Sequence, residues 1–156
     1  MVKIATERED FMDIRDMVRE RTEDYAEIYV SVFNGAPWNE SWTKEKAVRR
    51  IQDMMETNTF SGLALMDGEE VCGMIWGQKE QFYNGIHFQI QEFCIRSGCQ
   101  GKGYGPRLLQ AFTDRLKELG VTRIYLLTCP GKRTEGFYLS QGFHRSGSTI
   151  IMSCSN

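Results

Sequence analysis

Gln-Gly-Lys-Gly-Tyr-Gly-Pro occupies residues 100–106, between an apolar run that ends at Ile95 and an amphipathic segment that begins at Arg107. Three alternating glycines allow tight backbone turns and leave N–H groups accessible, because glycine adopts positive φ and has no side chain. A helix that begins at the end of such a turn directs unpaired N–H groups and a partial positive charge toward it. This stretch therefore predicts a phosphate-binding turn at a helix N-terminus.

Two common phosphate motifs do not fit this turn. A P-loop requires Lys followed by Ser or Thr, whereas Lys102 is followed by glycine. A dinucleotide-binding G-x-G-x-x-G pattern would need its third glycine where the chain has Pro106 or Leu108. The pattern that does fit is Q-x-x-G-x-G, in residues 100–105, after a predicted strand and before a predicted helix.

Length and composition indicate a single domain over residues 1–156. The chain has 41% hydrophobic and 26% charged residues, which is typical of a globular domain with a proper core. Five cysteines without a C-x-x-C pair, and only two histidines, argue against a disulfide framework or a metal site. No segment resembles a signal peptide or has membrane-spanning length. We expect a cytoplasmic protein with buried, reduced thiols, no metal and no membrane partner.

The net charge of −2 gives no indication of a nucleic-acid partner, but the charge is unevenly distributed. Residues 1–94 hold 10 Lys and Arg against 18 Asp and Glu, whereas residues 95–156 hold 9 against 3. If the two halves face different ligands, the first suits a cationic ligand and the second an anionic one. The alternative is that both sets of charges are solvated surface.

The hydrophobic pattern predicts a mixed α/β order without internal repeats or linkers. Predicted strands are residues 11–17, 59–66, 71–77, 86–96 and 121–128, with a final hairpin from Phe143 hinged near Gly147 and a strand-like N-terminal extension with Val2 and Ile4 inward. Predicted helices are residues 22–33 with Thr22 as the cap, a segment from Ser41 or Thr43 to Met55, residues 104–119 with Leu119 on the buried stripe, and residues 135–140.

An aromatic loop lies between the first two predicted helices. Trp38, Glu40 and Trp42 would allow this loop to form a substrate wall that receives an amine. The same tryptophans would equally serve as a lid over the core, and both interpretations remain open.

Three motifs, in their order and spacing, resemble the GNAT superfamily of N-acetyltransferases from about Phe11 onward. The first is Phe-Cys-Ile at residues 93–95, five residues before the glutamine, and the second is the glycine turn of residues 100–105. The third is Gly-Phe-Tyr-Leu-Ser-Gln-Gly-Phe at residues 136–143, which is similar to the family's F-Y-x-x-x-G-F signature. The resemblance implies a mostly antiparallel sheet, splayed between its fourth and fifth strands and flanked by helices.

The resemblance also implies acetyl-CoA as cosubstrate. Its pantetheine would lie between the splayed strands and bond to backbone N–H and C=O groups, since such groups require partners. The pyrophosphate would bind in the glycine turn, with Lys102 and Arg107 near the phosphates or in solvent. The expected cofactor-binding residues are Phe93, Cys94, Ile95, Gln100, Gly101, Lys102, Gly103, Tyr104 and Gly105.

The activity implied by the resemblance is acetyl transfer to a primary amine. Glu92 interrupts an apolar run and stands where many members carry a glutamate base. The alternatives are that a chain of water molecules acts as the base, and that Glu92 only forms an ion pair with a neighbour. Tyr138 stands where the family's general acid protonates the CoA thiolate; a core tyrosine is the alternative. The backbone N–H of Ile95 is expected to polarise the acetyl carbonyl.

Acceptors differ among family members, and specificity is expected in residues 34–43 and 79–85. Their acidic and aromatic content favours a cationic small-molecule or peptide amine, such as an aminoglycoside or a polyamine. The alternative function is a non-catalytic CoA-binding regulatory module, although binding alone requires neither Glu92 nor Tyr138. Homodimers are common in the superfamily, and the predicted final hairpin would supply an edge for one.

Overall fold

The computed structural model describes residues 12–156 and divides into two units, one ending at Leu126 and one spanning Leu127–Asn156. The expected extension with Val2 and Ile4 lies outside the described residues, and the single domain stays a prediction. The first unit contains β1 (Met12–Asp16), the 3₁₀ turn η1 (Arg19–Arg21), α1 (Thr22–Phe33), α2 (Lys44–Met55), β2 (Phe60–Asp67), β3 (Glu70–Phe82), β4 (Gly85–Ile95), the 3₁₀ turn η2 (Ser97–Cys99), α3 (Tyr104–Glu118) and β5 (Val121–Leu126). The second unit contains α4 (Glu135–Ser140).

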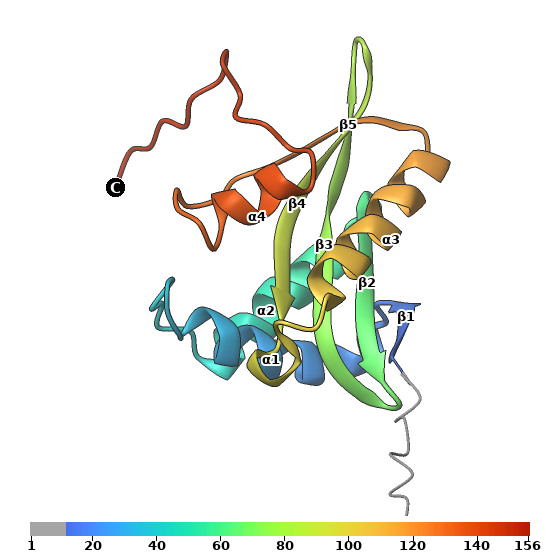
Figure 1. Ribbon diagram of the computed structural model, residues 1–156, viewed down its shortest axis with the longest axis vertical. Coiled ribbons are helices and arrows are strands. Elements are labelled where there is room, and N and C mark those ends of the chain that lie inside the picture. The colour runs from blue at the N-terminus through green and yellow to red at the C-terminus, as the bar shows by residue number, and fades with distance from the viewer. Residues whose placement is uncertain (1–11) are drawn as a thin grey trace, which may run out of the picture. The chain divides into compact units, whose positions relative to one another are not determined.

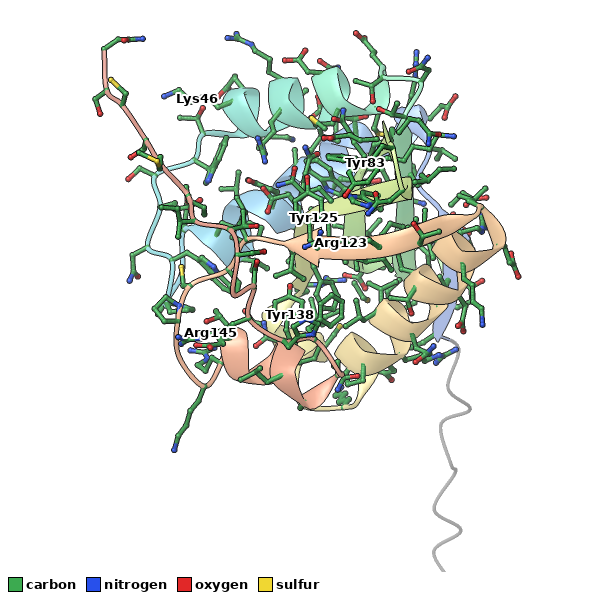
Figure 2. The ribbon with its side chains drawn as sticks, turned by 90° about the horizontal axis from the view of Figure 1, so that it is seen from above. Lys46, Tyr83, Arg123, Tyr125, Tyr138 and Arg145 are labelled. Atoms are coloured by element: carbon green, nitrogen blue, oxygen red, sulfur yellow. The ribbon has the colours of Figure 1, made fainter. Side chains whose placement is uncertain are left out.

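The five strands of the first unit form one mixed sheet in the order β1-β2-β3-β4-β5 (Figure 1). Neighbours from β1 to β4 run antiparallel, and β5 runs parallel to β4. Helices α1 and α2 lie on one side of this sheet and α3 on the other (Figure 2). The mixed α/β class and the run of antiparallel strands are therefore confirmed.

The helices of the first unit follow their apolar periodicity, but one of the two expected caps is wrong. Thr43 caps α2, because its side chain accepts a hydrogen bond from the backbone N–H of Lys46 at 3.3 Å. Arg21, not Thr22, is the N-cap of α1. The Thr22 hydroxyl donates backward to the carbonyl of Arg19 at 2.7 Å, since η1 brings that carbonyl within reach just before the helix begins.

Glycines delimit α3 at both ends. Gly103 is its N-cap with φ of 79°, and Gly120 follows its last turn with φ of 80°, both in the left-handed region that favours glycine. Pro106 lies in the first turn, where a missing N–H costs nothing. Leu119 was expected on the buried stripe, but it is the C-cap of α3 and is 45% exposed. The chain leaves the helix at this residue, so the side chain no longer follows the buried face. The buried residues of α3 are Leu108, Leu109, Phe112 and Leu116.

A β-bulge in β4 changes which face of the sheet its side chains reach. Trp76 of β3 pairs with Glu92, and the next residue, Gly77, pairs with Ile90, so Gln91 is an extra residue in β4. Before the bulge, Phe88 packs on α3, with its ring 5.4 Å from that of Phe112. After the bulge, Glu92 contacts α1 and α2 instead. One inserted residue thus directs a carboxylate away from the α3 side of the core.

The pairing between β4 and β5 ends at the bulge. The last pair in that ladder is Ile90 with Leu126, whereas β4 continues to Ile95 alongside β3. This is the splayed arrangement that the sequence resemblance implies.

In the second unit, α4 forms where it was predicted, but the prediction of a final hairpin is wrong. Among residues 127–156 there is no strand, and the three apolar side chains Ile150, Ile151 and Met152 are 81%, 69% and 85% exposed. A strand is stable only when it is paired, so β-forming composition alone does not produce one here. The expected dimer edge is correspondingly missing from this part of the chain.

We predict that Gly77→Ala destabilises the first unit, because a Cβ at Gly77 would lie 1.8 Å from the backbone oxygen of Gln89. Relief of this contact requires a backbone shift, at a cost of at least about 2 kcal/mol in the free energy of unfolding. Urea denaturation followed by circular dichroism measures it. Gly98→Ala is the matched control, since a Cβ there meets nothing within 4 Å; equal midpoints for the two variants would contradict the prediction.

Candidate active site

The carboxylate of Glu92 is held by three donors from the two helices on its face of the sheet. Its Oε1 atom accepts hydrogen bonds from the Tyr29 hydroxyl at 2.9 Å, from Arg50 Nη2 at 2.8 Å and from Arg50 Nε at 3.2 Å. Within residues 12–156, no donor is bonded to Oε2. The Glu92 side chain is only 13% exposed, so this is a mostly buried carboxylate with one oxygen fully engaged and the other available.

The three groups shift one another's pKa values. Burial raises the pKa of Glu92, while the Arg50 charge and the hydrogen bonds from Tyr29 and Arg50 oppose that rise. Burial and the adjacent Glu92 charge raise the pKa of Tyr29 far above its ordinary value. Burial is the largest single influence on Arg50 and lowers its pKa, but the Glu92 charge, the Tyr29 hydroxyl and the hydrogen bonds to both together outweigh it, so the net shift of the pKa is upward. Tyr29 therefore stays a neutral donor, and Arg50 stays charged.

The aromatic loop between α1 and α2 is continuous with this cluster. The Trp42 ring meets the Tyr29 ring edge-on at 4.9 Å, and the Trp42 Nε1–H donates to the Glu40 carboxylate. Trp38 packs edge-on against Phe33 at 5.1 Å. Both tryptophans are partly buried against the core, as the lid interpretation requires, and Trp42 also connects Glu40 to the group that holds Glu92.

The loop itself is fixed by the end of α1. The Asn34 side chain accepts from the Trp42 N–H at 2.8 Å and donates to the Trp42 carbonyl at 3.0 Å. The Glu40 N–H donates to the Phe33 carbonyl at 2.9 Å. The sequence placed Asn34 in the expected specificity segment of residues 34–43, but its structural role in the loop was not predicted.

Two members of the Glu92 cluster were also missed. Tyr29 lies in the predicted helix of residues 22–33, but no role was predicted for it. Arg50 was not singled out, although it stands three residues after buried Ala47 and beside buried Ile51. A cation at an inward helical position was the available signal, because such a charge requires a partner.

The glycine turn has the geometry of an anion site. Gly101 and Gly103 have φ of 74° and 79°, and a Cβ at either would meet nothing within 4 Å. No side chain caps the N-terminus of α3, and the partial positive charge of a helix N-terminus favours an anionic ligand there. Gln100 Nε2 donates to the Ile95 carbonyl at 2.8 Å and so ties the turn to the end of β4.

The other residues expected to bind acetyl-CoA lie on β4, in the glycine turn and at the start of α3. Phe93, Cys94 and Ile95 lie on β4 beyond its ladder with β5; Cys94 is buried and the other two are half-buried. Tyr104 and Gly105 begin α3, and Lys102 is exposed in the turn. Arg107, expected near the phosphates or in solvent, donates from Nη2 to the Met12 carbonyl of β1 at 2.9 Å.

Tyr138 lies in the second unit, on α4. Its ring is 5.2 Å from that of Phe137 and 5.7 Å from that of Phe143, and its carbonyl accepts from the Phe143 N–H at 3.0 Å. These contacts link the two ends of the F-Y-x-x-x-G-F signature. A catalytic role for Tyr138 stays a prediction.

Neither a cluster of metal ligands nor a membrane-spanning helix occurs within residues 12–156. In that range, no three His, Cys, Asp or Glu side chains come together as metal ligands. None of the helices described there combines the length and the apolar composition needed to cross a bilayer. All five cysteines are free; Cys72 and Cys94 are buried, whereas Cys129 and Cys154 are exposed, so the expected burial holds for only part of the set.

Solved structures of two acetyltransferases and of an integron cassette protein share this fold. An aminoglycoside acetyltransferase from an uncultured soil metagenomic sample, in complex with sisomicin, has a TM-score of 0.72 at 13% identity, with 94% of this chain and 97% of that chain covered. The aminoglycoside N-acetyltransferase AAC(6')-Iy in complex with CoA has a TM-score of 0.72 at 14% identity, with 92% and 94% covered. An integron cassette protein from the mobile metagenome of V. cholerae has a TM-score of 0.78 at 13% identity, with 94% and 93% covered.

Sequence comparison gives the family directly. No curated protein matches the chain in sequence. The model of the acetyltransferase (GNAT) family, however, matches residues 16–143, which include the Glu92 cluster, the glycine turn and the F-Y-x-x-x-G-F segment. The chain therefore belongs to the GNAT family of acetyltransferases.

Proposed function

We propose that the protein transfers an acetyl group from acetyl-CoA to a primary amine, with Glu92 as the base. The observation that carries this proposal is the position of Glu92 on β4. The mostly buried carboxylate lies next to the bulge in β4. Beyond it, β4 extends past the end of its pairing with β5 and leads to the glycine turn. One rigid element thus carries both the candidate base and the candidate donor site.

Residues 93–105 fit the donor. The open turn at Gly101 and Gly103, followed by an uncapped helix N-terminus, suits a pyrophosphate. The part of β4 beyond the β5 ladder suits the pantetheine amides, and the backbone N–H of Ile95 would polarise the acetyl carbonyl. Acetyl-CoA supplies the activated acyl group. Among the solved structures with this fold, AAC(6')-Iy is in complex with CoA, which supports the same choice of donor.

The proposed reaction begins with proton removal, because an alkylammonium has a pKa near 10 and lacks a free electron pair. Glu92 Oε2 accepts this proton, which leaves a neutral amine. The amine nitrogen then attacks the thioester carbonyl carbon, a C–N bond forms, and collapse of the tetrahedral intermediate breaks the C–S bond. Tyr138 donates a proton to the departing CoA thiolate. The second proton of the amine nitrogen, which becomes acidic once the C–N bond has formed, passes through solvent and restores the Tyr138 hydroxyl. The products are the N-acetyl amine, CoA thiol and one proton, which Glu92 returns to solvent.

The proposed acceptor is a cationic small-molecule or peptide amine. Glu40 lies close enough for its charge to raise the pKa of both Glu92 and Tyr29, so its negative charge adds to that of Glu92 beside Arg50. An acetyltransferase of the same fold is in complex with sisomicin, an aminoglycoside, and this supports a cationic acceptor class. The second candidate, a CoA-binding regulatory module, is favoured only by the donor-site geometry, which would serve binding without turnover.

Acetyl-CoA turnover over a panel of amines tests the proposal. Thiol release should be stimulated by aminoglycosides or polyamines, and more weakly by neutral or acidic amines, because of the excess of carboxylates. The specific control is Glu40→Gln, which should raise KM for the cationic acceptors alone. Tight CoA binding without stimulation by any amine would favour the regulatory module instead.

We predict that Glu92→Gln lowers kcat/KM by about 10²-fold near neutral pH, because proton removal loses its acceptor. The loss should shrink as pH approaches the pKa of the amine, where the free amine exists without a base. Thiol release measured from pH 6 to 10 checks this. A constant ratio to wild type across that range would remove Glu92 from the role of base.

We predict that Tyr138→Phe lowers kcat by about 10²-fold with little change in KM for acetyl-CoA, because the hydroxyl acts only on the leaving thiolate. The control is Tyr125→Phe, since Tyr125 lies on β5 and outside the residues expected to bind either substrate. Steady-state kinetics of the two variants provide the comparison. An unchanged kcat for Tyr138→Phe would exclude it as the acid.

A further inference from the structure

Arg50 is fixed by two contacts on the inner side of α2. Its Nε and Nη2 atoms both reach Glu92 Oε1, at 3.2 and 2.8 Å. Its guanidinium also lies 5.5 Å from the centroid of the Trp76 ring, in a cation–π arrangement. The Trp76 ring is fully buried on β3. Because a planar guanidinium is held between a carboxylate and a ring, its orientation determines that of the Glu92 side chain.

The two oxygens of the Glu92 carboxylate are used unequally. Arginine–carboxylate pairs frequently engage both carboxylate oxygens. Here Arg50 and Tyr29 crowd all three hydrogen bonds onto Oε1. The side chain is thereby immobilised while Oε2 keeps its capacity to accept.

We propose that Arg50 is a positioning residue, which holds the Glu92 carboxylate in one orientation and leaves Oε2 to take the proton of the acceptor ammonium. This inference rests on the proposed function, in which Glu92 is the base. Arg50 itself neither gains nor loses a proton in the step. The proton passes from the ammonium to Oε2, and Oε1 keeps its donors throughout.

The groups around Glu92 determine the sign of the effect on pH dependence. Arg50 from α2 and Tyr29 from α1 favour the ionised carboxylate, whereas burial and the Glu40 charge favour the protonated form. The Cys94 thiol, on the same strand, has a pKa raised by burial and by Glu92, so it stays neutral. Removal of Arg50 would leave the opposing effects in place. The pKa of Glu92 would rise, and the base would be lost at a higher pH than in the wild type.

Arg50→Met is the principal test variant. We expect the acid limb of kcat/KM against pH to move upward by about one pH unit or more, the size of shift that a neighbouring opposite charge produces. Arg50→Lys keeps the charge without the two-pronged contact, so it should show a smaller shift and a kcat about 10-fold lower than the wild type. Arg49→Met is the matched control, since Arg49 is the exposed neighbour on α2 and its profile should overlay that of the wild type.

Binding of acetyl-CoA, measured by calorimetry, provides the second readout. Its affinity should be unchanged in both Arg50 variants, because the donor residues lie on β4 and in the glycine turn. If Arg50→Met does not fold, Arg50→Lys decides the matter, and a wild-type kcat with an unshifted acid limb would overturn the inference. A uniform loss of rate at every pH would indicate a merely structural role and would also overturn it.

Glu92→Gln, assayed in parallel, separates a failure of the base assignment from a failure of the positioning role. If that variant loses rate as expected while the Arg50 variants keep the wild-type pH profile, the inference fails and the proposed base stands. If Glu92→Gln keeps the wild-type rate, the base assignment fails, and the positioning role of Arg50 fails with it.

Discussion

The arrangement around Glu92 depends on one extra residue in β4. Without the bulge at Gln91, the alternation set by Phe88 and Ile90 would direct residue 92 toward the face covered by α3, whose inner stripe is apolar. A carboxylate on that face would lack the donors that a buried charge requires. The bulge is in turn permitted by Gly77 on β3, where the backbone of β4 approaches too closely for any side chain. A backbone feature therefore decides which side chains can take part in the chemistry.

The Glu92 cluster is an electrostatic compromise. Complete burial of a carboxylate raises its pKa and would make it a neutral acid at neutral pH, whereas an exposed carboxylate has too low a pKa to accept a proton well. Partial burial combined with Arg50 and Tyr29 lies between these limits. Such pairs contribute little net stability, because desolvation offsets much of the attraction between the charges. Stability alone thus gives a weak reason for this cluster, and a task for the carboxylate gives a stronger one.

Much of the fold could be predicted because its determinants are local. The limits of α1, the glycines that delimit α3 and the β2–β3 hairpin follow from spacing and from residues with special backbone preferences. The bulge at Gln91 and the partnership of Arg50 with Glu92 could not be predicted, since both arise from pairing between segments that are distant in sequence. The prediction of a final hairpin was wrong for the same reason. Its residues have strand-like composition, but strand formation is decided by an edge elsewhere in the structure.

A division between backbone and side-chain recognition explains how the fold can persist when sequences diverge. Donor binding, as proposed, relies on N–H groups at the start of α3 and along β4, which require glycines at two positions and little else. Structures with 13–14% identity to this chain accordingly keep the fold, at TM-scores of 0.72–0.78. The face formed by α1, α2 and their loop instead uses side chains, among them Glu40, Trp42 and Arg50. Because side chains change more freely than a strand–turn–helix path, the choice of acceptor is expected to lie on that face.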